Sequence, residues 1–409
     1  MISSGWIDPS EERAQDARPN AERPRRVAIV TGTRAEFGLL KPVMEAVRDR
    51  SDLELLVIAA GSHLVQPALT FREVKRAFAV TDSVPMQVAG RTGRAADVEA
   101  LGKGIARFGR SFEGLRPDWV VVLGDRIEAF AAASAASVGG YAVAHIHGGD
   151  RAEGVSDEAM RHAITKLSHL HLAASENSGE RIRRMGERED MVFVVGSPAI
   201  DGLAHVEAMD DESFAALGSP AAVLLLHPIG RTNEQEELTA AAAIEGTLAG
   251  VDGAGVDGAG VLALHPNFDP GRDGIMRALL QAPSGMRVER HLARERFVSL
   301  LKRLGQSGGV LAGNSSAGLI EAGALGCPSV DIGPRQGGRE RSDGATVWVP
   351  DRAPDQPEAI ARAVRTARGL GPVGGAHPFG DGRAGVRIAG LLARLDPHSE
   401  GLIRKRCTC

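Results

Sequence analysis

Three side chains in the first half of the chain have the chemistry of proton transfer. Asp125 comes directly after the apolar run Val-Val-Val-Leu-Gly, and His147 lies in His-Ile-His-Gly-Gly-Asp, which closes another apolar run. Asp157 opens a helix-like segment, where its carboxylate could equally be only an N-cap. Carboxylates and an imidazole can remove and return protons near neutral pH, so these residues are candidate acids and bases.

A second set of polar residues indicates phosphate binding. Residues 313–316, Gly-Asn-Ser-Ser, follow an apolar run and open a predicted helix. The first N–H groups of a helix have no internal partner and attract anions. Ser315 and Ser316 add hydroxyls, and Glu321 lies in the next helical turn, suited to a ribose diol. A diphosphate cradle is predicted, with helix capping alone as the alternative. Three more polar residues follow apolar runs of this half: His227, Asn267 and Arg335.

The first junction after an apolar run, residues 32–38, carries a weaker signal. It has neither the P-loop pattern nor the three-glycine spacing of a dinucleotide site. Thr33 could simply cap the following helix, and Arg34 could pair with a phosphate or with Glu36. Arg126 follows Asp125 directly. No Cys and His spacing resembles a zinc site, so no metal is predicted.

These residues must be positioned by strands, because they recur where short apolar runs end. Strands of four to six residues without strict alternation, separated by amphipathic helices, are typical of parallel sheets covered on both faces. Ligands bind at the carboxyl ends of such strands. The predicted strands are Val27–Val30, Leu53–Ile58, Trp119–Leu123, Ala142–Ile146, His169–Ala173, Val192–Val195, Ala222–Leu226, Val261–Leu264, Gly309–Ala312, Pro328–Ile332 and Val347–Val349.

The polar stretch 201–220 separates two α/β halves of similar size. Val-Asp-Gly-Ala-Gly occurs twice within 251–260 and is interpreted as a solvated loop extension. The predicted organisation is a disordered tail (1–24), a Rossmann-like domain (25–205), a second Rossmann-like domain (220–380), a helix (381–398) and a tail (399–409).

Composition excludes several classes of protein. The chain has 409 residues with a formal charge of -4, whereas a general nucleic-acid binder usually has a basic excess. Three cysteines cannot form a disulfide framework, which favours a reducing cytoplasm. Residues 129–146 lack charged side chains but are mostly Ala, Ser and Gly, which predicts a buried helix and strand rather than a membrane span.

The motifs, taken in order, resemble those of hydrolysing UDP-N-acetylglucosamine 2-epimerases, bacterial enzymes that begin sialic and legionaminic acid synthesis. The resemblance extends from about Arg26 to Leu395. The matching segments are 31–38, 124–128, 145–150, 157–169, 313–318 and 333–341.

The resemblance implies a GT-B fold, with the sugar on the N-terminal side, the nucleotide in the C-terminal domain and the active site in the cleft between them. It implies loss of UDP with removal of the C2 proton, then hydration of the resulting 2-acetamidoglucal. The products would be UDP and N-acetylmannosamine, or a 2,4-diacetamido-6-deoxy analogue, with no cofactor and in a homo-oligomer. Asp125 and Asp157 match essential acidic groups. The matches to nucleotide and diphosphate contacts are Arg34, Arg126, His227, Asn267, Ser315, Ser316, Glu321 and Arg335.

Two departures from the family pattern are visible. Several members carry a catalytic Glu where this chain has His147, so the roles of acid and base among Asp125, His147 and Asp157 stay open. Members often have Ser in place of Arg272. The base (uridine or guanosine) and the sugar substituents also stay open. The alternatives are a non-hydrolysing 2-epimerase, a GT-B glycosyltransferase and a non-catalytic nucleotide-sugar-binding protein.

Overall fold

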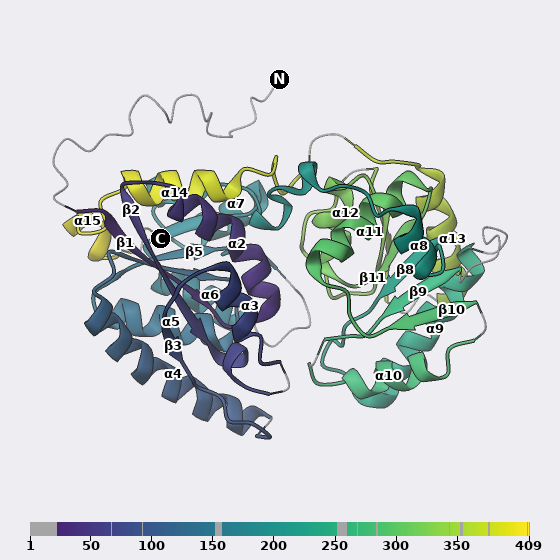
Figure 1. Ribbon diagram of the computed structural model, residues 1–409, viewed down its shortest axis with the longest axis horizontal. Coiled ribbons are helices and arrows are strands. Elements are labelled where there is room, and N and C mark those ends of the chain that lie inside the picture. The colour runs from purple at the N-terminus through teal and green to yellow at the C-terminus, as the bar shows by residue number, and fades with distance from the viewer. Residues whose placement is uncertain are drawn as a thin grey trace. The chain divides into compact units, whose positions relative to one another are not determined.

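The chain forms two compact α/β units (Figure 1). The first contains the described residues up to Asp150, from 158 to Asp201 and from Phe379 onward, and the second contains Arg151 and Gly202–Pro378. The computed structural model describes residues 23–66, 68–91, 93–151, 158–251, 260–267, 269–283, 285–342, 344–351, 355–374, 377–406 and 408. Asp157, the loop 252–259 and tail residues 1–22 lie outside these residues.

The first unit has a parallel sheet in the order β3-β2-β1-β4-β5-β6-β7. Its strands are β1 Arg25–Thr31, β2 Leu53–Ala60, β3 Val80–Val84, β4 Trp119–Leu123, β5 Ala142–Ile146, β6 Leu170–Ala173 and β7 Val192–Val194. Its helices are α2 Arg34–Arg48, α3 Phe71–Ala77, α4 Arg94–Leu115, α5 Ile127–Val138, α6 Glu158–Leu167, α7 Glu176–Arg184, α14 Ala384–Arg394 and α15 Glu400–Ile403, with 3-10 turns η1 Gly61–Leu64, η2 Glu189–Met191 and η3 Pro198–Ile200.

Helices cover both faces of this sheet (Figure 1). Alternate residues of β1 and β4 pack against α2 and α14 on one face, and the residues between them pack against α4 and α5 on the other. Burial on both faces explains why β4 reads as an unbroken apolar run. The last segment of the chain belongs to this core, because the Trp119 indole N–H donates to the carbonyl of Leu392 (3.1 Å).

The second unit has a parallel sheet in the order β10-β9-β8-β11-β12-β13, and α9, α10 and α13 contribute to its main core. Its strands are β8 Ala222–Leu225, β9 Val261–Leu264, β10 Met286–Glu289, β11 Val310–Gly313, β12 Ser329–Ile332 and β13 Thr346–Val349. Its helices are α8 Asp211–Ala216, α9 Asn233–Val251, α10 Arg272–Leu280, α11 Arg294–Gln306, α12 Glu321–Ala324 and α13 Gln356–Gly369, with 3-10 turns η4 Leu203–His205 and η5 Ser316–Gly318.

The prediction of two Rossmann-like parallel sheets is confirmed, and every predicted strand overlaps an observed strand. Two strands were not predicted, β3 and β10. Both lie at a sheet edge, and their side chains are largely half-buried or exposed. Their sequences, Val-Thr-Asp-Ser-Val and Met-Arg-Val-Glu, therefore lack the apolar run that marks an inner strand.

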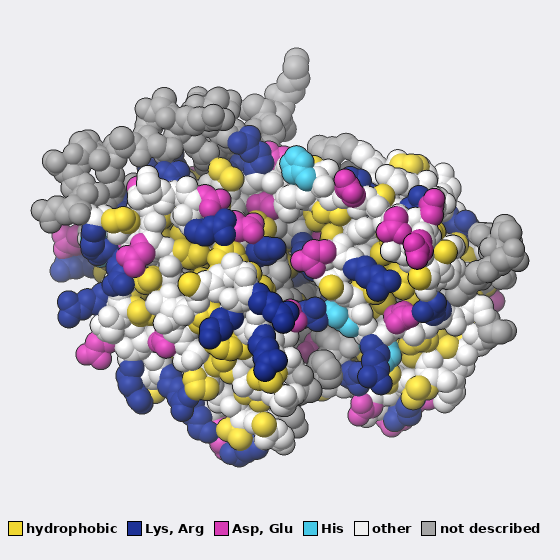
Figure 2. Space-filling view, viewed as in Figure 1, with side chains coloured by type: hydrophobic (Ala, Val, Ile, Leu, Met, Phe, Trp, Pro, Cys, Tyr) yellow, Lys and Arg dark blue, Asp and Glu magenta, His cyan; other side chains and the backbone are white. Residues whose placement is uncertain are grey.

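Acidic and basic side chains are interspersed over the face shown in Figure 2, in agreement with the small net charge. None of the helices in the described part of the chain combines the length and apolarity needed to cross a bilayer.

Candidate functional site

Two of the predicted proton-transfer residues, Asp125 and His147, lie at the carboxyl ends of strands in the first sheet. The strand order reverses between β1 and β4, so the loops after these two strands lead to helices on opposite faces. A crevice at such a reversal is where open α/β sheets bind ligands. Arg34 follows β1, Asp125 and Arg126 follow β4, and His147 follows the neighbouring strand β5.

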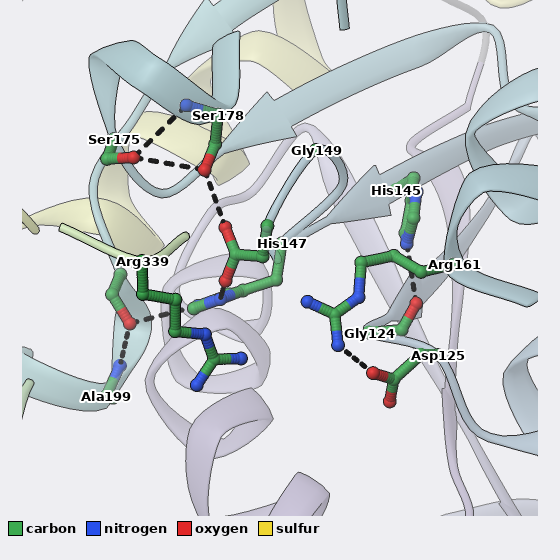
Figure 3. Close-up of polar contacts among 12 residues, drawn as sticks. Gly124, Asp125, His145, His147, Gly149, Arg161, Ser175, Ser178, Ala199 and Arg339 are labelled. Carbon is green, nitrogen blue, oxygen red and sulfur yellow. Dashed lines mark hydrogen bonds and ion pairs between the residues drawn. The ribbon is translucent and has the colours of Figure 1, made fainter. Parts of the chain in front are cut away.

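Asp125 forms an ion pair with a residue that the sequence did not single out. Its carboxylate contacts the guanidinium of Arg161, which α6 contributes and which is almost fully buried (Figure 3). The Asp125 side chain itself is 20% exposed. The contact therefore places a carboxylate and a guanidinium together at the carboxyl end of β4.

The loop after β5 holds His147 inside a chain of polar contacts (Figure 3). Its Nδ1 lies 2.8 Å from Asp150 Oδ2, and its Nε2 lies 2.9 Å from the hydroxyl of Ser197. The Ser178 hydroxyl donates to the other Asp150 oxygen (2.8 Å). His147 has φ of 63°, a left-handed conformation that is uncommon for a residue with a side chain. The surrounding contacts therefore determine its position.

The neighbouring His145 has a different role. It is fully buried, its Nε2 donates to the carbonyl of Gly124 (2.8 Å), and its Nδ1 faces the Thr165 hydroxyl (3.2 Å). Burial lowers the pKa of His145 to about 3. The neutral ring thus links the carboxyl ends of β4 and β5, the strands that Asp125 and His147 follow.

Two buried carboxylates lie beside the junction after β1: Glu36 of α2 and Glu128 of α5. Thr33 and Glu36 form a capping box at the start of α2, and Glu36 also accepts from the amide of Gly32 (2.8 Å). The fully buried Glu128 accepts from Gln87 (2.8 Å) and lies 3.7 Å from Arg126 Nε. Burial, reinforced by the charge of Glu128, raises the pKa of Glu36 to about 8.

Arg34 is exposed and pairs with Glu73 (3.1 Å) rather than with Glu36. Thr33 is a helix cap, as predicted, and Arg34 extends from the first turn of α2. An exposed guanidinium in a surface ion pair can exchange that partner for an anionic ligand at little cost.

We expect Glu36→Gln to change how stability depends on pH. The pKa of Glu36 is about 8 in the folded chain and near 4.5 when unperturbed, so the wild type loses stability as pH rises from 4.5 to about 8. Relative to the wild type, Glu36→Gln should therefore become more stable over this interval, by about 2–5 kcal/mol. Urea unfolding of both proteins at pH 4.5, 6 and 8 measures this, and a difference that does not change with pH would contradict it.

In the second unit the strand order reverses between β8 and β11, and the residues after these strands bind each other. The amide of His227 donates to Asn314 Oδ1 (2.7 Å), and Asn314 Nδ2 donates back to the carbonyl of His227 (2.8 Å). His227 Nδ1 accepts from the amide of Asn267 (3.2 Å), which follows β9. Burial, together with Arg335, lowers the pKa of His227 to about 3.

Arg335 joins this group, because its guanidinium donates to the carbonyl of Asn314 (3.3 Å). Gln336, which is fully buried, donates to the same carbonyl (2.8 Å). The structure thus brings together His227, Asn267, Asn314 and Arg335 at the carboxyl edge of the second sheet. The half-buried guanidinium of Arg335, with the uncharged polar side chains of His227 and Asn267 beside it, could bind an anion such as a phosphate.

The helix predicted after Ser315 and Ser316 is interrupted. Ser315 caps the 3-10 turn η5, and the chain resumes as a single α-turn at Glu321. The Ser329 hydroxyl donates to the carbonyl of Gly318 (2.7 Å), an acceptor that a continuous helix would use itself. Both serines remain half-buried at the sheet edge, and Glu321 accepts from Arg294 (3.0 Å).

Sequence reasoning did not single out Asp150, Arg161 or Ser197. Asp150 stands in the predicted motif, three residues after His147, but its contact with the ring depends on the turn between them. Ser197 lies fifty positions from His147, and no local pattern reports that contact. Within the described residues, no three His, Cys, Asp or Glu side chains gather closely enough to hold a metal ion.

Two Rossmann-like parallel-sheet units define a GT-B-like protein. A crystal structure of UDP-GlcNAc 2-epimerase from Neisseria meningitidis bound to UDP-GlcNAc matches with a TM-score of 0.72 and 19% identity, covering 90% of this chain and 100% of that one. The structure from Methanocaldococcus jannaschii in complex with UDP-GlcNAc and UDP matches with a TM-score of 0.71 and 20% identity, covering 90% and 99%.

Residues 45–393 match the family model for UDP-N-acetylglucosamine 2-epimerase, and the chain belongs to this family. The UDP-N,N'-diacetylbacillosamine 2-epimerase (hydrolyzing) of Legionella pneumophila is 32% identical over 388 residues, which cover 92% of this chain and 97% of that protein. The resemblance found in the motifs is thereby confirmed.

Proposed function

We propose that this chain is a hydrolysing UDP-N-acetylglucosamine 2-epimerase, which releases UDP and a free 2-epimeric sugar. The sugar would be N-acetylmannosamine or a 2,4-diacetamido-6-deoxy analogue. The observation that carries the proposal is the similarity to the Legionella hydrolysing relative over 97% of that relative's length. The pairing of Asp125 with Arg161 supports it, since a carboxylate held at the carboxyl end of a strand is a candidate for proton transfer.

The proposed reaction has two steps. A base removes the C2 proton while the C1–O bond to the diphosphate breaks, which leaves a 2-acetamidoglucal and UDP. Water then adds to C1, and C2 receives a proton on the opposite face. A proton beside an acetal carbon is weakly acidic, so the base and the groups that stabilise the departing diphosphate must act together.

We assign proton transfer to residues of the first unit, nucleotide binding to residues of the second, and phosphate contacts to residues of both. Asp125, His147 and Asp157 are the candidates for acid and base, and Asp157 lies outside the described residues. The nucleotide set is His227, Asn267, Ser315, Ser316, Glu321 and Arg335, with Arg34 and Arg126 as further phosphate contacts.

An NMR assay in D₂O tests the function. The purified chain is incubated with UDP-N-acetylglucosamine, its 4-acetamido-6-deoxy analogue and the GDP-linked forms. Hydrolysis predicts UDP or GDP together with a free sugar deuterated at C2. Accumulation of a nucleotide-linked, C2-inverted sugar would support the non-hydrolysing alternative, and no conversion of any of the four would remove the proposal.

Arg335→Ala should weaken UDP binding on the order of 10- to 100-fold, because a charge-assisted hydrogen bond contributes roughly 1.5–3 kcal/mol. Arg365→Ala is the matched control, since Arg365 contacts the carbonyl of Ala249 near the carboxyl ends of α13 and α9. Both helices end on the side of the sheet where the strands begin, whereas Arg335 lies on the side where the strands end. Calorimetric titration with UDP measures both affinities, and equal losses in the two variants would contradict the assignment.

A further inference from the structure

The imidazole of His147 is held at both of its nitrogens inside the first unit. Nδ1 lies 2.8 Å from Asp150 Oδ2 and Nε2 lies 2.9 Å from Ser197 Oγ. His147 is 5% exposed, Asp150 is 1% exposed and Ser197 is fully buried. An imidazole between a carboxylate and a hydroxyl is the arrangement by which enzymes orient a histidine for proton transfer.

Asp150 determines which nitrogen carries the proton. An ionised carboxylate only accepts hydrogen bonds, so the nitrogen that faces it must be protonated, and that nitrogen is Nδ1. Asp150 is itself held in place, because the Ser178 hydroxyl donates to its second oxygen (2.8 Å) and the Ser175 hydroxyl donates to that of Ser178 (3.0 Å). Both serines belong to the start of α7 and are buried.

Ser197 gives Nε2 a partner in either charge state of the ring. When the ring is neutral, the Ser197 hydroxyl donates to the lone pair of Nε2. When the ring gains a proton, Nε2–H donates to the same oxygen, because a hydroxyl can serve as donor or acceptor. Ser197 Oγ also accepts from the amide of Ala199 (3.2 Å), which fixes its position. The ring can thus gain and lose a proton without movement of heavy atoms.

We propose that Asp150 is a positioning residue that keeps His147 protonated at Nδ1, so that Nε2 is the atom that takes up and returns a proton in the reaction. This inference rests on the proposed function and deepens it. When His147 acts as the base, the C2–H bond of the sugar breaks and its electron pair forms the C1–C2 double bond as the diphosphate leaves. The proton forms an N–H bond at the Nε2 lone pair, from which the Ser197 O–H has turned away. The resulting imidazolium is stabilised by the carboxylate of Asp150, and the same N–H bond breaks when the proton is returned.

The tautomer of His147 tests the positioning role without any turnover. In the wild type, ¹⁵N NMR of the neutral ring should place the proton on Nδ1, with the resonances assigned by their loss in His147→Gln. In Asp150→Ala the proton should move largely to Nε2. A wild-type ring protonated at Nε2, or an unchanged tautomer in Asp150→Ala, would overturn the proposal whatever the enzyme's substrate is.

Turnover separates positioning from a structural role. Asp150→Asn should lower kcat on the order of 10²-fold with little change in KM and should alter the pH dependence of kcat. Ser197→Ala should lower kcat about 3- to 10-fold and keep the Nδ1 tautomer, because one neutral hydrogen bond contributes about 1 kcal/mol. If the Asp150 variants fail to fold, Ser197→Ala still tests the role of the contacts around His147.

Glu187→Gln is the matched control, because Glu187 Oε2 accepts from Nε2 of another buried histidine, His171 (3.0 Å), in the same unit. This variant should lose stability but keep its kcat per folded molecule. A kcat for Asp150→Asn equal to that of Glu187→Gln would show that Asp150 only stabilises the fold.

Discussion

Asp125→Asn is expected to lower turnover by about 10²-fold or more while UDP affinity changes little. The amide has nearly the shape of the carboxylate but neither its charge nor its basicity. It therefore cannot take a proton or balance the guanidinium of Arg161, which is 4% exposed at its side chain. Initial rates with the substrate identified in the NMR assay, together with calorimetric titration of UDP, measure the two effects.

Asp118→Asn is the matched control for this prediction, because Asp118 lies just before the same strand β4, at its opposite end. Its carboxylate is buried and, like that of Asp125, is paired with an arginine, Arg23 (2.9 Å). It also accepts from the amide of Arg26 (2.7 Å). The control should lose stability but not turnover. Near-normal rates in Asp125→Asn, or equal losses in both variants, would show that the assignment of Asp125 is wrong.

Gly149→Ala is expected to be strongly destabilising and to disrupt the position of His147. Gly149 has φ of 74°, and a Cβ there would lie 2.2 Å from the carbonyl oxygen of Ser178. The start of α7 would have to move, and Asp150 would lose the hydroxyl of Ser178. Positive φ costs about 1–2 kcal/mol, and the steric overlap should add roughly 1–3 kcal/mol.

Gly140→Ala separates the two contributions. Gly140 has φ of 77°, but a Cβ added there would meet no atom within 4 Å, so only the conformational cost applies. Urea unfolding should therefore show Gly149→Ala to be less stable than Gly140→Ala, and only Gly149→Ala should lose turnover. Equal destabilisation of the two variants would show that the contact between residue 149 and the carbonyl of Ser178 does not affect stability.

The inner strands could be predicted from the sequence because burial on both faces demands unbroken apolar runs, as in β4. Edge strands such as β3 have one neighbour and partly exposed side chains, so their composition does not mark them. The same reasoning placed Asp125 and His147 correctly at strand ends. It could not find Ser197, whose contact with His147 depends on how two distant loops pack.

The break between η5 and α12 shows a similar limit. Small residues and serines after β11 predict a helix start, which is correct for Ser315 as a cap. At the break, the hydroxyl of Ser329, which belongs to the next strand, donates to the carbonyl of Gly318. Helix propensity cannot predict such a tertiary hydrogen bond, so the conformation around Glu321 could not be predicted from the sequence.

The return of the chain to the first unit has a consequence for protein synthesis. The core of that unit includes Ile388 and Leu392 of α14, and the carboxylate of Asp201 accepts from the amides at the start of that helix, Ala384 (2.9 Å) and Gly385 (2.6 Å). A ribosome translates these residues after Gly202–Pro378. The second unit can therefore fold during translation before α14 is available to the first, and a nascent chain released before α14 would carry an incomplete core in the first unit.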